Sequence, residues 1–250
     1  MKNVLITGCS SGFGLETARH FLERDWSVIA TMRTPRTGLL PDSERLRVLE
    51  LDVTDAASIR RAVDAAGPVD ALVNNAGIGV LYPLEGIAMD SARAVFETNT
   101  LGTIAMTQAL LPGFRARRAG VIVNVSSAVT LRSLPLLSVY SASKAAVNGF
   151  TESLALELAP FGIRTHLVLP GRSPETRFGE HARALMHGDL PVEYQPALDA
   201  VFAGARAPGP VTHAQDVARA VWRAVTDPTA PLRLPAGEDA EAMAAEGQGR

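Results

Sequence analysis

The chain has 250 residues, of which 47% are hydrophobic and 20% are charged, and its formal net charge is −2. This size fits one large domain or two small ones, and the globular composition argues against long disordered segments. The near-zero charge argues against a dedicated nucleic-acid-binding protein, and the single cysteine, Cys9, excludes an internal disulfide and a cysteine-rich metal site.

The start of the chain, Met1 to Thr7, predicts a strand and leaves no room for a signal peptide. No apolar run approaches the roughly 20 residues that a membrane span requires. We therefore expect a protein of the reducing cytoplasm, with no membrane span and no nucleic-acid partner.

Short apolar runs alternate with segments of helical spacing along the chain. Strands are predicted at residues 4–6, 28–30, 46–51, 69–73, 121–125 and 163–169. Helices are predicted at 15–24, at 54–63 with Thr54 as N-cap, at 91–117 with an interruption near Pro112, at 138–158 and at 239–245. Continuous apolar strands with helices between them indicate an α/β fold whose parallel sheet is covered on both faces.

Residues 171–212 differ from the rest of the chain in composition, because they are rich in proline and glycine and their apolar side chains are scattered. A segment of this length inside one domain is typical of a substrate loop or lid, and short helices are expected in it at about 176–187 and 196–203. The substrate is expected to be an apolar small molecule. The candidate lining residues are Leu81, Leu134, Leu136, Met186, Tyr194 and Phe202.

A glycine-rich turn follows the first predicted strand and opens the first helix. Its sequence is Thr7-Gly8-Cys9-Ser10-Ser11-Gly12-Phe13-Gly14, with the spacing G-x-x-x-G-x-G. Glycines allow a tight turn, and the N–H groups of a helix N-terminus attract a pyrophosphate. The turn therefore predicts a dinucleotide cofactor, although a plain strand–helix turn also uses glycine.

The end of the second strand, Ala30-Thr31-Met32-Arg33, indicates which dinucleotide binds. Folds that choose NAD place an acid there to hold the ribose 2′-hydroxyl, and this chain has none. Arg33 can instead bind a 2′-phosphate with two hydrogen bonds from its guanidinium group, and the hydroxyls of Ser10 and Ser11 can add further donors. NADP(H) is therefore favoured over NAD(H), the alternative being that Arg33 is a solvated loop arginine.

Tyr140 and Lys144 lie four residues apart at the start of a predicted helix and share one of its faces. A nearby cation stabilises phenolate, so Lys144 is expected to lower the pKa of Tyr140 and let it exchange a proton with a substrate oxygen. A Tyr-x-x-x-Lys pair is common by chance, and its catalytic interpretation depends on the other polar residues that accompany it. These are Ser126 and Ser127, the Asn74–Gly77 segment, and Asn99 inside a helix.

Taken together these motifs resemble the short-chain dehydrogenase/reductase family, in its short single-domain branch and over about residues 2–236. The resemblance implies one catalytic domain, 1–250, with a Rossmann-type doubly wound sheet of seven parallel strands in the order 3-2-1-4-5-6-7. It implies the catalytic residues Asn99, Ser127, Tyr140 and Lys144, with Ser126 as the alternative to Ser127. It implies a cofactor site formed by Gly8, Ser10, Ser11, Gly12, Phe13, Gly14, Arg33, Asp52, Val53, Asn75, Ala76, Gly77, Tyr140, Lys144, Pro170, Gly171 and Thr176.

In the implied roles, Asp52 and Val53 lie at the adenine end, Lys144 holds ribose hydroxyls and Asn99 positions a proton-relay water. Where the family has a threonine that contacts the carboxamide, this chain is about one residue longer. Thr176 is expected there, with Ser173 as the alternative.

The implied reaction interconverts a carbonyl and an alcohol, and the sequence is most similar to hydroxysteroid and retinol dehydrogenase-like members. One alternative is a 3-oxoacyl-carrier-protein reductase, which needs a basic docking patch such as Arg115, Arg117 and Arg118. The other is a nucleotide-binding regulator without catalysis, which should lack Tyr140 or Lys144.

A homodimer or homotetramer is expected, because family members pair through two long central helices. Here the helix at 138–158 carries more apolar residues than one sheet contact needs. They are Ala145, Ala146, Phe150, Leu154 and Leu158.

Overall fold

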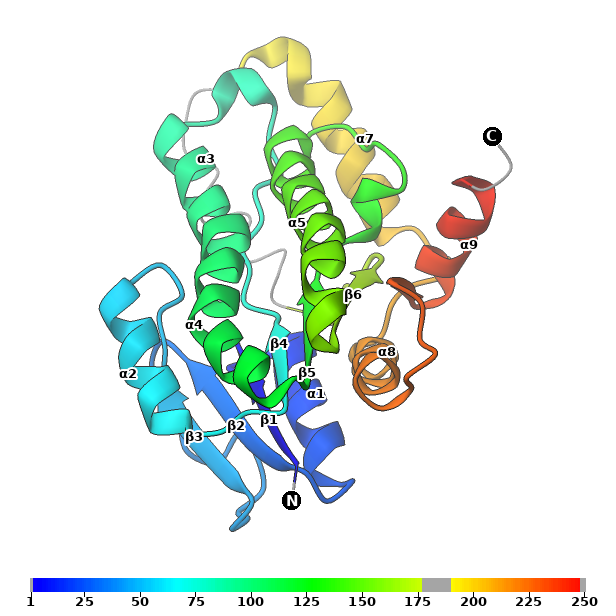
Figure 1. The fold of residues 1–250 in the computed structure, drawn as a ribbon. Helices are drawn as coiled ribbons and strands as arrows, with labels where there is room; N and C mark the ends of the chain where they lie inside the picture. The colour runs from blue at the N-terminus through cyan, green and yellow to red at the C-terminus, as the bar shows by residue number, and fades with distance from the viewer. Residues whose placement is uncertain (1, 177–189, 248–250) are drawn as a thin grey trace.

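Seven parallel strands form one sheet in the order β3-β2-β1-β4-β5-β6-β7 in the computed structural model, which describes residues 2–176 and 190–247 (Figure 1). The strands are β1 (Asn3–Ile6), β2 (Ser27–Met32), β3 (Leu46–Glu50), β4 (Ala71–Asn74), β5 (Gly120–Val125), β6 (Ile163–Pro170) and β7 (Arg233–Ala236). The predicted Rossmann-type strand order is confirmed. The order reverses between β1 and β4, and a ligand crevice is expected at such a switch point, beyond the carboxyl ends of the strands.

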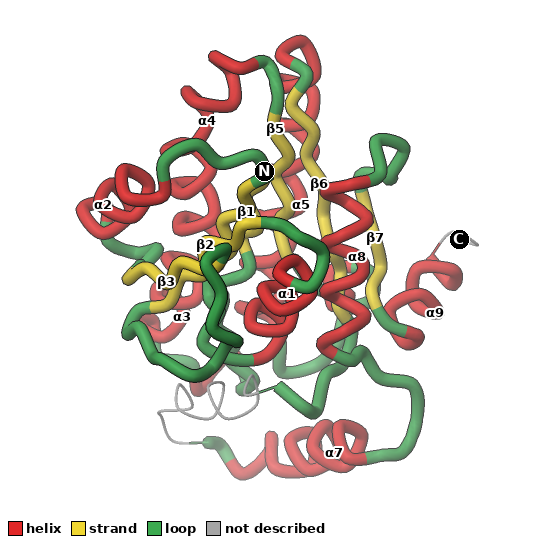
Figure 2. Tube along the Cα trace, turned by 90° about the horizontal axis from the view of Figure 1, so that it is seen from below, coloured by secondary structure: helices red, strands yellow, loops and turns green. Residues whose placement is uncertain are grey.

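Helices cover both faces of the sheet (Figures 1 and 2). The described helices are α1 (Gly12–Leu22), α2 (Ala56–Ala66), α3 (Met89–Phe96), α4 (Gly102–Arg117), α5 (Ser138–Leu158), α7 (Gln195–Arg206), α8 (Ala214–Thr226) and α9 (Glu238–Gly247). Short 3₁₀ turns lie at Leu84–Gly86, Ala128–Thr130, Ala159–Phe161 and Val192–Tyr194, and a π-helical turn lies at Glu97–Leu101. None of the helices within the described ranges combines the length and apolar character needed to cross a bilayer.

Alternation along each strand produces two hydrophobic cores, one on each face of the sheet. Val4 and Ile6 of β1 pack with α1 and α8, whereas Leu5 between them packs with α2, α4 and α5. Phe21 on the first face and Phe114 on the second are fully buried. The two cores fix the sheet between its helical layers and hold the carboxyl edge of the strands in place.

Two predicted features of the helices are wrong, namely the N-cap at Thr54 and the interruption near Pro112. Asp55 is the N-cap of α2 and accepts a hydrogen bond from the Ala57 N–H, while Thr54 turns toward Asp52. The predicted interruption near Pro112 does not occur, because α4 continues through this residue with Leu110 and Phe114 buried on either side. The long helical stretch is interrupted earlier, at the π-helical turn.

The seventh strand was implied only by the family resemblance, because its four residues show no strong apolar run. Its identity depends on pairing with β6, where Val168 faces Leu234. The helix predicted at 196–203 is confirmed within α7, and the one predicted at 239–245 is confirmed within α9. The helix predicted at about 176–187, which would carry Met186, falls largely outside the described residues.

Candidate active site

Three glycines shape the turn between β1 and α1. Gly8 and Gly12 have φ angles of 75° and 57°, a left-handed conformation that L-residues disfavour. A Cβ on Gly14 would lie 2.4 Å from the carbonyl oxygen of Gly8, so α1 packs directly on the turn. Ser11, the N-cap of α1, makes no side-chain capping hydrogen bond, and the first helical N–H groups can face an anion.

Asn75 braces this turn from the end of β4. Its Nδ2 donates to the carbonyl oxygens of Thr7 and Gly8, at 2.9 and 3.2 Å. In return, the hydroxyl oxygen of Thr7 accepts the N–H groups of Asn75 and Ala76, both at 2.9 Å. The carboxyl ends of β1 and β4 are thereby joined at the switch point of the sheet.

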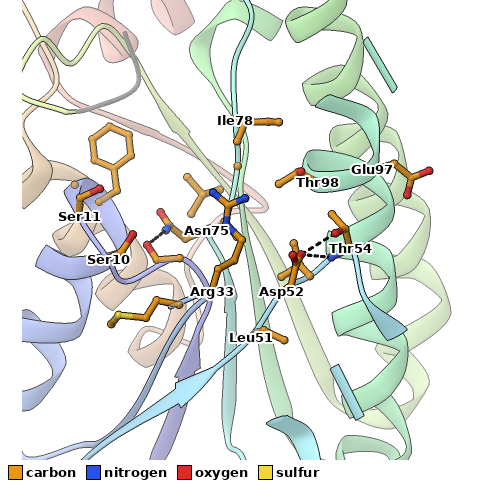
Figure 3. Close-up of a pocket in the computed structure, with 18 of the residues that line it drawn as sticks. Ser10, Ser11, Arg33, Leu51, Asp52, Thr54, Asn75, Ile78, Glu97 and Thr98 are labelled. Atoms are coloured by element: carbon orange, nitrogen blue, oxygen red, sulfur yellow. Dashed lines mark hydrogen bonds between the residues drawn. The ribbon is translucent and has the colours of Figure 1, made fainter. Parts of the chain in front are cut away.

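A cavity of about 790 Å³ opens beside the turn (Figure 3). Predicted site residues that line it are Gly8, Ser10, Ser11, Gly12, Phe13, Arg33, Asp52, Val53, Asn75, Ala76, Gly77, Tyr140, Lys144 and Thr176. Gly14, Asn99, Ser127, Pro170 and Gly171 are not among its lining residues, and neither are the described members of the apolar set proposed to contact substrate.

The cavity also has lining residues that sequence reasoning did not select. They are Met32, Leu51, Thr54, Ile78, Ala94, Glu97, Thr98 and Val125, together with Ser126, which was named only as an alternative. Met32, Leu51 and Val125 lie at or just beyond the carboxyl ends of strands, so applying the strand-end rule to every strand would have found them. Glu97 and Thr98 belong to the π-helical turn, which carried no signal in the sequence.

Arg33 and Asp52 both line the cavity and lie side by side in the close-up (Figure 3). Partial burial acts to raise the pKa of Asp52, but two hydrogen bonds from Thr54 and the positive charge of Arg33 outweigh it and hold this pKa below its usual value. Arg36, which sequence reasoning missed, donates from Nη2 to the carbonyl oxygen of Ser10 at 3.1 Å. One guanidinium group, that of Arg33, therefore lines the cavity, and a second, that of Arg36, contacts the glycine-rich turn.

Tyr140 and Lys144 line the cavity, and Ser127 lies behind them as a partner of Tyr140. Tyr140 is hydrogen-bonded to the hydroxyl of Ser127, and both side chains are buried. Ser126 instead donates its hydroxyl to Asn148 Oδ1 at 2.6 Å, which favours Ser127 as the partner of the phenol. The Lys144 ammonium lies 6.0 Å from the centroid of the Tyr140 ring and donates to the carbonyl oxygen of Val125 at 2.9 Å.

The expected acidification of Tyr140 by Lys144 is wrong for the chain by itself. Burial raises the pKa of Tyr140 to about 12, and the hydrogen bond from Ser127 offsets only part of that rise. Burial also lowers the pKa of Lys144 to about 8. The low-polarity surroundings penalise both charged forms more than the two groups relieve one another.

Asn99 lies in the π-helical turn and not in a regular helix. It is fully buried, and its amide pairs with the backbone of Ile78 in both directions, accepting from N–H and donating to the carbonyl oxygen, each at 2.8 Å. Its Nδ2 also donates to Ser143 Oγ at 3.0 Å. Asn99 therefore ties the segment after β4 to the helix that carries Tyr140 and Lys144.

The segment after β6 reaches the cavity through Thr176. The methyl carbon of Thr176 would lie 3.4 Å from a Cβ on Gly12, at the edge of the glycine-rich turn. Its hydroxyl donates to the carbonyl oxygen of Ser173 at 2.9 Å. Ser173 does not line the cavity, although its own hydroxyl oxygen is buried without a partner in the described parts of the chain. Pro170 and Gly171 form the base of this segment.

A family model described as short chain dehydrogenase matches residues 2–184. Among curated proteins, retinol dehydrogenase 8 of Bos taurus is 42% identical over 182 residues, which cover 68% of this chain and 58% of that protein. The 17-beta-hydroxysteroid dehydrogenase type 1 of Homo sapiens is 41% identical over 179 residues, covering 66% of this chain and 52% of that protein. These matches thus span between half and three-fifths of the relatives' length.

Solved structures share the fold over nearly the whole chain. A short chain dehydrogenase from Burkholderia cenocepacia in complex with NADP has a TM-score of 0.78 and 28% identity, with 100% of this chain and 94% of that chain covered. A short chain dehydrogenase/reductase from Burkholderia phymatum in complex with NAD has a TM-score of 0.83 and 28% identity, with 99% and 92% covered. The strand order, the braced glycine turn and the family-model match over most of the chain lead to one assignment: this chain belongs to the short-chain dehydrogenase/reductase family.

Proposed function

We propose that the protein is an NADP(H)-dependent oxidoreductase that interconverts a carbonyl and a secondary alcohol on an apolar small molecule. The observation that carries this proposal is the hydrogen bond between Tyr140 and Ser127 at the cavity that Lys144 also lines. A proton donor, an orienting hydroxyl and a cation thus lie together beside a cradle for a pyrophosphate.

The described residues fit a nicotinamide dinucleotide. Gly8 and Gly12 keep the turn open to an anion, because their positive φ angles exclude most side chains. Ser10, Ser11 and the α1 N-terminus would hold phosphate, and Arg33 and Asp52, which line the same cavity, would bind the adenosine part. When bound, the dinucleotide supplies the hydride in reduction and accepts it in oxidation.

The chain's own groups handle orientation and the proton. Ser127 would donate a hydrogen bond to the substrate oxygen, fixing it beside the Tyr140 hydroxyl. Tyr140 donates its proton to that oxygen in reduction and takes it back from the alcohol in oxidation. Because burial raises its pKa, the phenol carries its proton at neutral pH in the chain by itself. Lys144 would hold ribose hydroxyls, and Asn99 would maintain the position of the helix that carries both groups.

The preference for NADP(H) rests on charge at the end of β2. Met32 and Arg33 line the cavity where an acid would otherwise repel a 2′-phosphate, and Arg36 adds a second guanidinium beside Ser10. The two related structures hold different dinucleotides, NADP in one and NAD in the other, so this preference is an inference from the residues. We also propose a reducing, cytoplasmic environment, in which the buried thiol of Cys9 persists.

The alternative of a 3-oxoacyl-carrier-protein reductase is disfavoured by the contacts of Arg117 and Arg118, two of the three arginines considered for its docking patch. Arg117 donates to the carbonyl oxygen of Val69 and Arg118 to that of Pro160, which precede β4 and β6 respectively. Both arginines therefore lie toward the amino edge of the sheet, away from the cavity, which argues against their forming a docking patch beside it. The regulator alternative is also disfavoured, because Tyr140 and Lys144 are both present at the cavity.

The direct test is a substrate panel with purified protein, in which oxidation of NADPH or NADH is followed by absorbance. We expect turnover of apolar ketones with NADPH, a lower rate with NADH, and little activity on a β-ketoacyl thioester. Dinucleotide binding without turnover of any carbonyl or alcohol would instead support the regulator.

A further inference from the structure

The segment from Gly171 to Thr176 is held at its base by two side chains from the C-terminal part of the chain. Asp239, in the first turn of α9, is 9% exposed, and its Oδ2 accepts the N–H of Arg172 at 2.6 Å. Its Oδ1 lies 2.7 Å from the hydroxyl of Thr212. One buried carboxylate thus joins two segments that are far apart in sequence.

Thr212 completes this arrangement. Its hydroxyl oxygen accepts the N–H of Gly171 at 2.8 Å, and its own N–H donates to the carbonyl oxygen of Arg172 at 2.8 Å. The single hydroxyl hydrogen is shared between Asp239 and the carbonyl oxygen of Ala236, which is 2.8 Å away. Thr212 is fully buried, so no solvent competes for these groups.

Two glycines make the close packing possible. A Cβ on Gly171 would lie 2.1 Å from the nearer carboxylate oxygen of Asp239. Gly237 has a φ of 99°, and a Cβ there would lie 2.2 Å from the Thr212 hydroxyl oxygen. The need for glycine at 171 therefore arises from contact with Asp239, since this glycine does not line the cavity.

The arrangement bears on the cofactor site because Thr176, five residues after Gly171, lines the cavity beside Gly12. Next to it in sequence, Glu175 pairs with His213, the neighbour of Thr212. The ion pair between Glu175 and His213 is exposed and contributes little to stability. It joins the same two segments of the chain as the hydrogen bonds of Thr212 do. The backbone position of residues 171–176 therefore depends on contacts with residues at the start of α8 and α9 and after β7, and not only on β6.

We infer that Thr212 and Asp239 are positioning residues for the proposed cofactor site: they fix the backbone of residues 171–176 so that Thr176 completes the cavity wall. Both lie beyond residue 184, where the match to the family model ends. The inference rests on the proposed dinucleotide-binding function. Loss of either side chain would leave a partly buried backbone N–H, that of Gly171 or of Arg172, without its acceptor. We expect this loss to increase the local mobility of residues 171–176 before it affects the rest of the fold.

The test compares matched substitutions. Asp239→Asn removes the charge and one acceptor oxygen, and Glu238→Gln makes the same chemical change on the exposed neighbour. Thr212→Val removes the hydroxyl at constant shape, and Thr212→Ser restores it. The readouts are amide hydrogen exchange of peptides covering 171–176, and NADPH binding by fluorescence titration.

For Asp239→Asn and Thr212→Val we expect faster exchange at 171–176, unchanged exchange in β1 and β4, and a Kd for NADPH raised about tenfold. Glu238→Gln and Thr212→Ser should stay within about twofold of the unaltered protein. Unchanged exchange and Kd in both Asp239→Asn and Thr212→Val would overturn the inference alone. Failure of the unaltered protein to bind NADPH or NADH would overturn the proposed function, and with it the cofactor role of this pair. If Asp239→Asn does not fold, Thr212→Val against Thr212→Ser decides the question.

Discussion

Asn99 Nδ2 donates a hydrogen bond to Ser143 Oγ, and this 3.0 Å contact joins the π-helical turn to the helix that carries Tyr140 and Lys144. Ser143 lies immediately before Lys144, is fully buried and donates its own hydroxyl hydrogen to the carbonyl oxygen of Tyr140 at 2.7 Å. Thr100, also in the turn, donates to the carbonyl oxygen of Ser143 at 3.1 Å. The position of Tyr140, the proposed proton donor, therefore depends on Ser143, which is not among the residues that line the cavity.

Ser143→Ala should lower kcat by about ten- to a hundredfold and leave the Kd for NADPH within about twofold, because small displacements of catalytic groups are costly and the glycine-rich turn is untouched. Ser141→Ala is the matched control, since the Ser141 hydroxyl oxygen is buried without a partner among described residues. Steady-state kinetics and fluorescence titration separate the two parameters. Equal effects of the two substitutions would contradict the positioning role.

Tyr140→Phe should reduce turnover by at least about 10²-fold while NADPH still binds. The phenol hydroxyl is the proposed proton donor, and the ring supplies only packing in a buried site. Single-turnover measurements with a competent ketone, together with NADPH titration, check both parts. Activity within a few-fold of the unaltered protein would remove Tyr140 from the mechanism.

Arg33→Ala should weaken NADPH binding by roughly ten- to a hundredfold and leave NADH nearly unchanged, because a hydrogen bond to a charged group contributes about 1.5–3 kcal/mol. Arg60→Ala, on the exposed side of α2, is the control for loss of one positive charge. Titration of both cofactors against both variants gives the comparison. Equal losses for NADPH and NADH would show that Arg33 does not bind the 2′-phosphate.

The lowered pKa of Lys144 predicts that the free energy of unfolding increases with pH. Its pKa is about 8 in the folded chain and 10.5 as the ordinary value, so between these limits the unfolded chain binds more protons and the free energy of unfolding increases with pH. The contribution is fully present above 10.5 and is lost as the pH falls through 8. It amounts to on the order of 3 kcal/mol over the full range. Tyr140, whose pKa is raised from 10 to about 12, opposes this trend only above pH 10.

Chemical denaturation at pH 7.5 and 9.5 measures this linkage. Lys144→Met should show a smaller increase between the two pH values than the unaltered protein, because the titrating ammonium is gone. An equal increase in both proteins would assign the pH dependence to other groups.

The expected oligomer can be tested at the exposed side of α4 and α5. Of the apolar residues expected on α5, Leu154 and Leu158 pack against the sheet. Leu156 of α5 is 79% exposed, and Leu101, in the π-helical turn before α4, is 49% exposed. We predict a dimer or tetramer by light scattering at micromolar concentration, and a monomer for Leu156→Glu. Leu84→Glu, at an equally apolar exposed site on a 3₁₀ turn, should leave the assembly intact. A monomeric unaltered protein would contradict the prediction.

The sequence by itself determined the features that depend on local pattern. Continuous apolar runs located six strands, and the glycine spacing after β1 located the turn that we propose binds phosphate. Since the carboxyl ends of parallel strands share one edge, polar residues at those ends were expected near one another, and Asn75 after β4 and Ser126 after β5 do line one cavity.

Tertiary structure decided what depends on contacts between distant segments. The π-helical turn forms around the buried amide of Asn99, and β7 exists as a strand because β6 offers it an edge to pair with. Burial, which no local pattern reports, raises the pKa of Tyr140 where proximity to Lys144 predicted a fall. Asp239 meets Arg172 only because β7 returns the chain beside β6, so its contact with the segment after β6 could be found only in the folded chain.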